Sequence, residues 1–463
     1  MKNLLKKKDF AEAGALYFIA TLFNKGIGFV TVPIFSRILT TSDYGTVTTF
    51  NSWVSMISVF ISLALYNAVR NSFVDMDDKE RPHFLSTIIT FTGLVFLTVM
   101  GVCVVATVFV PRNINTALIF MCIIQSFGYA LINDYSYYLM MRYRYKFRAA
   151  LMVLPGLISV VLSIFAILFI LKDNLYLGRI VPTTAVYGIF AIVVLMAVYS
   201  KTKPELNLDY LKYGLKIALP LVLHSIALQI LSQSDRVMIT SLRNAAETGV
   251  YSLVYNLSMI ATVITTSLDG IWVPWFTGKL KERKIREINV LAMDYVHLMT
   301  YAMVALILVG PEILKIFADQ RYWEGMSIIP PIALANYMIF MYTMYVYIEH
   351  YYKKTVYITK NTLIAAGLNV ILNFILIPKY GYVAAAYTTL ASYFVAFILH
   401  SRYAKKIEPD IYPLKMFALP LLHVGGAIIL YYPLLNFWTL RWGILFAVSY
   451  THLRAHETGR NLV

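Results

Sequence analysis

Long apolar runs recur along the chain and are separated by short polar turns. A helix needs about 20 apolar residues to cross a hydrocarbon layer about 30 Å thick, and the runs reach that length. Of all residues, 59% are hydrophobic and only 14% are charged, which is too apolar for a soluble domain. The sequence therefore predicts an all-α polytopic membrane protein. Its predicted spans lie near 13–38, 46–69, 84–110, 114–140, 149–171, 178–199, 211–235, 249–276, 288–309, 327–350, 355–377, 381–401 and 413–435, with a truncated fourteenth that begins near 438.

The chain is strongly basic, with a formal net charge of +16. Such a charge would suit a nucleic-acid-binding protein, but the positions of the basic residues indicate another cause. With the N-terminus placed in the cytoplasm, most lysines and arginines fall in alternate loops on that side, as at 142–148 and 279–286. This is the bias that the positive-inside rule describes. The sequence therefore predicts a multi-pass membrane protein with a cytoplasmic N-terminus and no nucleic-acid partner.

One charge interrupts the first long apolar run, Ala13 to Leu39. Lys25, preceded by Asn24, falls near half depth of this predicted span. A lysine at that depth costs roughly 2.5–3.5 kcal/mol on insertion scales, so it is not expected to face lipid. The sequence favours a lysine that faces a wet cavity or an anionic partner, and the alternative is one that snorkels or pairs within the bundle.

Short motifs recur at an offset of about 200 residues, as they do in transporters built from two related halves. Asp43-Tyr44-Gly45 is echoed by Glu247-Thr248-Gly249, and Leu177-Gly178 is echoed by Tyr380-Gly381. Six predicted spans separate the partners each time. An even number of spans gives the two copies the same orientation, so we expect two parallel lobes.

This repetition predicts how the chain divides. The N-terminal six-helix lobe covers 1–200, and the basic, polar segment 201–208 is a cytoplasmic linker. The C-terminal six-helix lobe covers 209–405. Additional spans, the thirteenth and part of the fourteenth, cover 406–448. Charges in 449–463 stand where a helix should still be in hydrocarbon, so this segment is interpreted as an artefactual tail without function.

Several further motifs, in the expected order and spans, carry a family resemblance over roughly residues 10–435. They are Ser36-Arg37-Ile38-Leu39 with Asp43-Tyr44-Gly45, Ser234-Asp235-Arg236-Val237-Met238-Ile239 with Glu247-Thr248-Gly249-Val250-Tyr251-Ser252, and Leu368-Asn369-Val370-Ile371-Leu372-Asn373 with Ile377-Pro378-Lys379-Tyr380-Gly381 and Ala384-Ala385-Ala386. With them the chain resembles the bacterial polysaccharide (Wzx-like) flippases. Their superfamily also holds the multidrug (MATE) extruders and the lipid II flippase.

The resemblance implies a MATE-like fold, in which two six-helix lobes surround a central cavity that opens alternately to each side. It implies a flippase in the bacterial inner or plasma membrane, for O-antigen, capsule or exopolysaccharide. Its substrate would be a lipid-linked oligosaccharide, a polyprenyl-pyrophosphate sugar repeat, carried from the cytoplasmic to the outer leaflet. The lipid bilayer, a polysaccharide polymerase and chain-length proteins are the other partners implied.

Polar residues within the predicted spans are the candidate functional residues. Arg70 matches a family arginine at the cytoplasmic end of the second span, and a guanidinium suits a phosphate because it donates two parallel hydrogen bonds. The expected substrate-binding residues are Lys25, Asn24, Arg70, His224, Gln229 and Asp269. For the deeper ones among them, hydrogen bonding between helices is the alternative. Asp235 and Arg236 are expected at the lobe end, as a gating pair or simply neutralising each other.

Tyrosine is abundant, with 35 residues, and many tyrosines lie inside predicted spans, as at Tyr135, Tyr137 and Tyr138. A ring with a hydroxyl group can stack on a sugar and hydrogen-bond to its rim. Packing and anchoring at the membrane interface is the alternative explanation.

Enzymatic functions find little support in the sequence. It has no Gly-rich phosphate loop of the Gly-x4-Gly-Lys-Ser/Thr type and no Cys/His cluster with metal spacing, so no catalytic residues, cofactor or metal are expected. Two rival functions stay open. One is a cation-coupled multidrug antiporter of the same fold, for which Asp134 and Asp269 are candidate acids. The other is a membrane-embedded polysaccharide polymerase.

Overall fold

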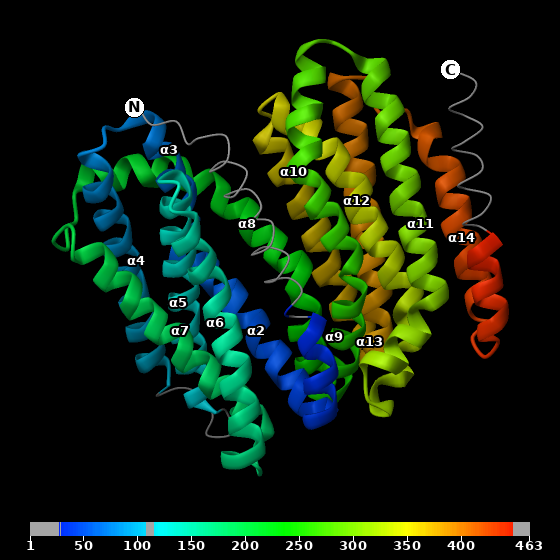
Figure 1. Cartoon of the computed structure of the whole chain (residues 1–463), viewed down its shortest axis with the longest axis horizontal. Helices are drawn as coiled ribbons and strands as arrows, with labels where there is room; N and C mark the ends of the chain where they lie inside the picture. Colours follow the sequence, from blue (N-terminus) through cyan, green and yellow to red (C-terminus); the bar gives the residue numbers. More distant parts are fainter. Residues whose placement is uncertain (1–26, 28, 108–114, 448–463) are drawn as a thin grey trace. The chain divides into compact units, whose positions relative to one another are not determined.

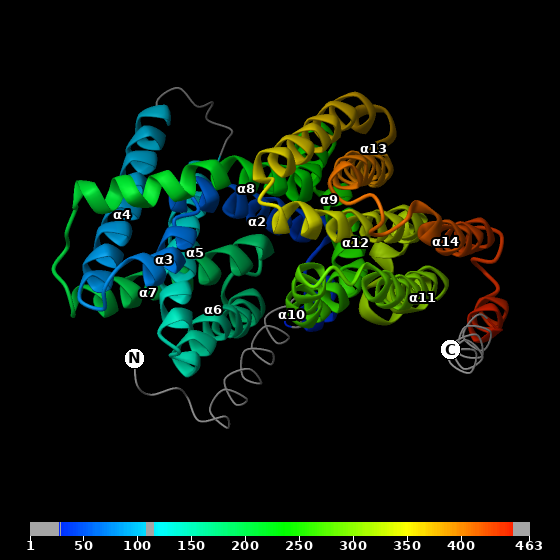
Figure 2. The ribbon, with the colours of Figure 1, turned by 90° about the horizontal axis from the view of Figure 1, so that it is seen from above.

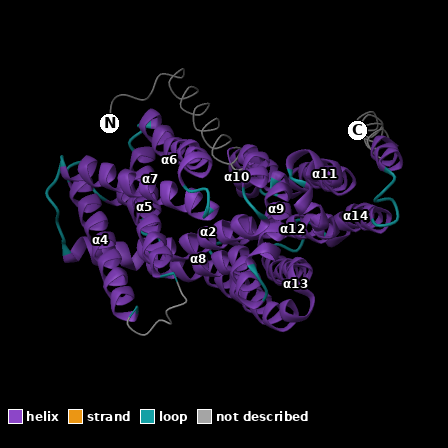
Figure 3. Ribbon diagram, turned by 90° about the horizontal axis from the view of Figure 1, so that it is seen from below, coloured by secondary structure: helices purple, strands orange, loops and turns teal. Residues whose placement is uncertain are grey.

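The computed structural model describes residues 27, 29–107 and 115–447. All regular elements in these ranges are helices (Figures 1 and 3). The chain forms two compact units, Met1–Thr248 and Gly249–Val463. Each unit is described by itself below.

Besides the short apolar helix Phe29–Ile38, the first unit contains seven numbered α-helices and a short π-helical extension within its described residues. They are α2 (Thr41–Ser62), α3 (Tyr66–Asp75), α4 (Glu80–Ala106), α5 (Thr116–Met141), α6 (Tyr145–Phe165) continued by η1 (Ala166–Ile170), α7 (Leu175–Tyr199) and α8 (Leu208–Leu242). Helix α8 packs along α2 and α3, and α5 packs between α2 and α7 (Figure 2).

The division between the units falls within α9 (Ala245–Ser258). The second unit then continues with α10 (Ile260–Lys281), α11 (Ile285–Phe317), η2 (Gln320–Ile328), α12 (Ile329–Tyr351), α13 (Thr355–Ile407), η3 (Leu414–Phe417) and α14 (Ala418–Tyr431). Its most deeply buried helix is α12, which packs against α13, α11 and α10.

Ten helical segments of the described chain are long and apolar enough to cross a membrane, judged by length and composition. They correspond to the predicted spans from 46–69 to 211–235 and from 288–309 to 413–435. The predicted span 249–276 corresponds to α9 and α10, which are not among the ten. The predicted fold class, an all-α polytopic membrane protein, is confirmed. Most of the predicted first span and the whole segment 449–463 lie outside the described residues.

The segment Thr41–Asp75 is long enough to span as one helix, but it is broken into α2 and α3. Leu63 and Ala64 adopt left-handed backbone conformations, with φ of 46° and 53°. A left-handed residue other than glycine costs roughly 1–3 kcal/mol, so the surrounding structure must hold the break in place.

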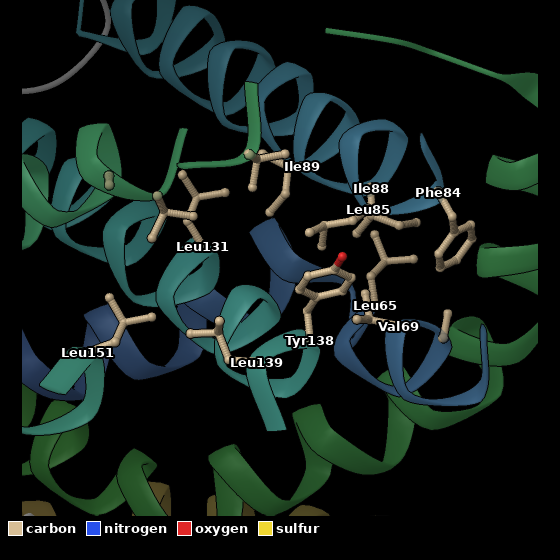
Figure 4. Packing of buried hydrophobic residues seen from close by; sticks show 14 of the residues in the cluster. Leu65, Val69, Phe84, Leu85, Ile88, Ile89, Leu131, Tyr138, Leu139 and Leu151 are labelled. Carbon is tan, nitrogen blue, oxygen red and sulfur yellow. The ribbon is translucent and has the colours of Figure 1, made fainter. Parts of the chain in front are cut away.

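A buried hydrophobic cluster holds α3 directly after this break (Figure 4). Leu65, which directly precedes α3, and Val69 of α3 are fully buried. They pack near Phe84 and Ile88 of α4 and Tyr138 of α5. Fully burying side chains of this size contributes about 1.5–3 kcal/mol each. The cluster can therefore offset the cost of the two left-handed residues.

Helix α13 contains 53 residues, and at about 1.5 Å per residue it would be about 80 Å long if straight. It is instead divided at Gly381, where φ is 62° and ψ is −150°. This region is essentially restricted to glycine, because a Cβ atom would clash there. Pro378, which cannot donate a hydrogen bond to the preceding turn, weakens the helix just before the kink. The two halves match the predicted spans 355–377 and 381–401.

Both motifs of the predicted repeat, Asp43-Tyr44-Gly45 and Glu247-Thr248-Gly249, lie in the first turn of a helix. Asp43 and Thr40 form a reciprocal capping box at the start of α2. Asn244 accepts a hydrogen bond of 2.8 Å from the backbone amide of Glu247 at the start of α9. The division of the chain by contacts places α8 in the first unit, whereas the predicted C-terminal lobe begins at 209. The predicted lobes rest on internal repetition and stay a prediction.

Candidate substrate-binding site

A cavity of about 290 Å³ with both polar and apolar lining residues lies within the first unit, next to the break between α2 and α3. Its lining comes from α2, the break, the first residue of α3, α5 and α8. The polar lining residues are the serines Ser58, Ser62 and Ser225, the tyrosines Tyr66 and Tyr129, and the amides Asn133 and Gln229. None of the lining residues carries a formal charge. The cavity therefore offers hydrogen-bond donors and acceptors without a net charge.

The two amide side chains are the most versatile groups in this lining. Asn133 and Gln229 are both half-buried, and neither side chain hydrogen-bonds to another residue in the described part of the chain. An amide offers two N–H donors and one oxygen acceptor. A ligand with hydroxyl groups could therefore satisfy both.

Two arginines lie near Tyr137, a ring that packs against the cavity-lining Tyr66. The ring of Tyr66, which lines the cavity, stacks on Tyr137 with centroids 4.8 Å apart. The Arg148 guanidinium lies 6.0 Å from the centroid of Tyr137, and its Nε donates to Ser136 Oγ at 3.1 Å. Arg70 and Arg148 are both within electrostatic reach of the Tyr137 hydroxyl. Arg70 and Arg148 thus place positive charge near Tyr137, whose ring stacks on the cavity-lining Tyr66.

More positive charge gathers around the loops that follow α5 and α7. Arg142, Arg144 and Lys201 are exposed, and none of them forms an ion pair with another described residue. Partial desolvation, together with the positive charges of Arg144 and Arg142, lowers the pKa of the Lys201 ammonium.

A basic loop in the second unit shows a different arrangement. Between α10 and α11, Lys279 pairs with Glu287 at 2.6 Å and Lys284 pairs with Glu282 at 3.0 Å. The Lys284 ammonium also holds the pKa of the Glu282 carboxyl below its usual range. The two loop regions therefore differ: these two lysines are paired with glutamates, whereas Arg142, Arg144 and Lys201 form no ion pair with a described residue.

The structure brings together only some of the predicted site residues. Gln229 lines the cavity. Arg70 lies on α3, one helical turn beyond the cavity-lining Tyr66. His224 is half-buried on α8, directly before Ser225, but is not part of the lining.

The other predicted site residues lie elsewhere. Lys25 and Asn24 lie outside the described residues. Asp269 belongs to α10 of the second unit, where it lies beside the hydroxyl groups of Tyr347 and Tyr295. Their roles in substrate binding stay predictions.

Asp235 and Arg236 are both buried on α8. Consecutive residues on a helix do not face each other, which disfavours a simple mutual pair. Arg236 donates from one nitrogen to the carbonyl oxygen of Ser232 at 2.9 Å and to Gln233 Oε1 at 3.1 Å. Gln233 Oε1 also accepts a hydrogen bond from Ser52 of α2, so this network connects α8 to α2 within the first unit. A gating role stays a prediction.

Sequence reasoning missed two features. The first is the presence of Asn133, Tyr66 and Tyr129 in the cavity lining. Of these, Asn133 stands out in the sequence as a polar residue within an apolar span. The second feature is a pair formed by Glu349 and His400, which lie 51 residues apart in the sequence. The structure joins these two fully buried side chains by a hydrogen bond of 2.8 Å between α12 and α13.

A family model described as polysaccharide biosynthesis protein matches residues 10–278. The chain belongs to this family. A protein from the Lsg locus of Haemophilus influenzae is 20% identical over 285 residues, which is 58% of this chain and 66% of that protein. The chain thus spans slightly less than two thirds of that relative.

Solved structures share the fold. The lipid II flippase MurJ, in an inward closed conformation, superposes with a TM-score of 0.73 at 15% identity, covering 97% of this chain and 99% of that chain. A MATE transporter from Vibrio cholerae gives a TM-score of 0.57 at 12% identity, covering 88% and 98%. At this identity the likeness shows the fold alone. The resemblance inferred from the sequence is confirmed for the polysaccharide biosynthesis family and for the MATE-like fold.

Proposed function

We propose that the chain is a flippase for a lipid-linked oligosaccharide. It moves a sugar repeat on a polyprenyl pyrophosphate from the cytoplasmic to the outer leaflet of a bacterial cell membrane. The observation that carries the proposal is a cavity lined by uncharged polar groups, with two arginines close to its lining residue Tyr66. Arg70 follows Tyr66 by one turn of α3, and Arg148 lies beside Tyr137, on which Tyr66 stacks. Membership of the polysaccharide biosynthesis family and the fold shared with a protein named lipid II flippase support it.

The chemistry of such a substrate matches the two parts of the site. A pyrophosphate is strongly anionic, and moving it through a bilayer is costly unless positive groups replace its hydration. Arginine offers bidentate, charge-assisted hydrogen bonds to phosphate oxygens. Sugar hydroxyls both donate and accept hydrogen bonds, as the cavity residues do. The isoprenoid tail can stay in lipid while the headgroup crosses by alternating access.

A multidrug antiporter of the same fold is the main rival. A cavity for organic cations is expected to place carboxylates in its lining, and this one has none. Asp134, the acid nearest to Asn133 in sequence, is 0% exposed and is not part of the lining. The site therefore favours a headgroup that combines an anion with neutral polar groups.

Reconstitution of the full chain into liposomes tests the proposal. The substrate is the lipid-linked glycan extracted from cells that lack this chain, and its translocation is followed by accessibility to an external glycan-modifying reagent. We expect Arg70→Ala to slow translocation about tenfold or more, because it removes a charge-assisted contact of about 1.5–3 kcal/mol. Arg70→Lys should retain part of the rate.

The matched control is Lys281→Ala, which removes an exposed cation from the second unit. It should translocate the glycolipid at the wild-type rate. Wild-type liposomes that export organic cations but leave the glycolipid in place would refute the proposed function. Equal rates for Arg70→Ala and Lys281→Ala would refute the role of Arg70.

A further inference from the structure

We propose that the cavity between α2, α3, α5 and α8 binds one uncharged sugar ring of the substrate, the ring attached directly to the pyrophosphate. Asn133 and Gln229 are its selective contacts. This inference rests on the proposed function and adds the chemical class of the group that the cavity takes. The cavity lies wholly within the first unit.

The lining chemistry selects a neutral, hydroxylated ligand. The amides of Asn133 and Gln229 both donate and accept, and Ser58, Ser62 and Ser225 belong to the same lining. The Ser58 hydroxyl already donates to the carbonyl oxygen of Ser55 at 2.8 Å. An apolar chain in the cavity would leave the two amides unpaired, at about 1–3 kcal/mol for each buried group. An ionised group would find no opposite charge within the lining. A sugar ring with several hydroxyls fits this inventory.

The volume limits how much of the substrate can enter. About 290 Å³ lies just below the range of roughly 300–1,000 Å³ that is typical of small-molecule sites. This is room for one ring, not for a whole oligosaccharide repeat. The remaining sugars would extend outside the cavity and contribute little to its selectivity.

Two tyrosines that line the cavity are held in place by partner rings. Tyr66 stacks on Tyr137 with centroids 4.8 Å apart, and Tyr129 stacks on Tyr187 at 5.3 Å. Rings that are already ordered lose little conformational entropy when a ligand binds. Their apolar surface can contact the C–H groups of a sugar, and a hydroxyl remains for its rim.

The spacing between Tyr66 and Arg70 along α3 indicates which sugar ring the cavity binds. Tyr66 and Arg70 are one helical turn apart, which corresponds to about 6 Å along the helix axis. In a pyrophosphate-linked glycan the first ring is bonded to the phosphate, so the two groups are neighbours. A pyrophosphate held at Arg70 therefore places the first ring at the level of Tyr66.

Binding to two probes tests the inference with the purified full chain in nanodiscs. One probe is the lipid-linked glycan extracted from cells that lack this chain, and the other is the sugar-free polyprenyl pyrophosphate. We expect the wild-type chain to bind the glycolipid more tightly. Asn133→Leu and Gln229→Met keep the side-chain volume but remove the hydrogen bonds. Each should weaken glycolipid binding about three- to tenfold and leave binding of the sugar-free probe unchanged.

Asn51→Leu is the matched control, because Asn51 is an exposed amide on α2 that does not line the cavity. It should bind both probes as the wild type does. If an amide variant does not purify in folded form, Ser62→Ala, which removes a single hydroxyl from the same lining, replaces it with the same expected pattern.

The outcomes separate the inference from the proposed function. The proposed sugar site is refuted if the wild type binds both probes equally. It is also refuted if the amide variants weaken binding of both probes alike or of neither. Pyrophosphate recognition survives in each of these cases. If the wild type binds neither probe, or if cells lacking the chain accumulate no lipid-linked glycan, the proposed function itself is wrong.

Discussion

Replacing Gly128 by alanine tests how closely α5 and α7 must approach each other. A Cβ atom at Gly128 would lie 2.4 Å from the backbone oxygen of Tyr187 and 2.8 Å from its carbonyl carbon. Both distances are shorter than real Cβ atoms tolerate, and no side-chain rotation can relieve a contact with backbone atoms. The two helices would have to separate by several tenths of an ångström. The neighbouring stack of Tyr129 on Tyr187 would be disturbed.

The expected magnitude follows from opposing terms. Alanine is favoured over glycine inside a helix by up to about 1 kcal/mol. Overpacking a close contact costs about 1–3 kcal/mol, and this contact belongs at the upper end because the backbone cannot move aside. A weakened aromatic pair adds about 0.5–1.5 kcal/mol. We expect a net destabilisation of about 1–3 kcal/mol.

Gly101→Ala is the matched control, because no atom lies within 4 Å of a Cβ built at Gly101 on α4. Unfolding midpoints of the purified variants are compared in one detergent at one heating rate, since membrane proteins often unfold irreversibly. Gly101→Ala should melt at or above the wild type, and Gly128→Ala below it. If Gly128→Ala melts as high as Gly101→Ala, the close α5–α7 approach is not a constraint on stability.

Three further predictions concern the second unit and use the same unfolding assay. Gly381→Ala should lower the midpoint by the equivalent of about 1–3 kcal/mol, because the φ of 62° and ψ of −150° at this position suit only glycine. An unchanged midpoint would show that this backbone conformation does not require glycine. Glu349→Met and His400→Leu should each lower the midpoint, because each leaves one buried partner unpaired. The double variant should lose less stability than the sum of the two single losses, and additive losses would show that the pair is not coupled. Arg441→Lys should lower the midpoint nearly as much as Arg441→Ala. All five N–H groups of Arg441 hydrogen-bond to Glu312 or to backbone carbonyls, and a lysine ammonium has only three N–H donors. A wild-type midpoint for the lysine variant would contradict this.

Apolar length was enough to predict most of the helical spans, because it reports directly on burial in hydrocarbon. The kink at Gly381 was also predictable, since glycine and Pro378 mark the boundary between two apolar runs. The break between α2 and α3 was not. The residues at 62–65 read Ser-Leu-Ala-Leu and contain no helix breaker. Their conformation is imposed by the packing of α3 against α4 and α5, which a local pattern cannot report.

The candidate site was predictable in part for the same reason. Gln229 and Arg70 stand out as polar residues in or beside apolar spans. Gln229 lines the cavity, and Arg70 lies one helical turn from the lining residue Tyr66. Asn133 belongs to the same class, but the sequence does not show which face of α5 meets the broken helix. The partnership of Glu349 with His400 is also invisible, since it joins two spans that are distant in sequence.

The break in the second span explains why polar residues gather at one level of the first unit. Residues 63–65 interrupt the helical ladder, and in hydrocarbon the backbone groups freed by such an interruption need polar neighbours. The backbone of Tyr66 faces the fully buried carboxyl group of Asp134, and Asn133 of the same helix lines the cavity. The break between α2 and α3 also borders the cavity, because Ser62, Ala64 and Tyr66 line it. One local distortion, held by the buried cluster around Leu65, thus contributes polar groups to the cavity lining.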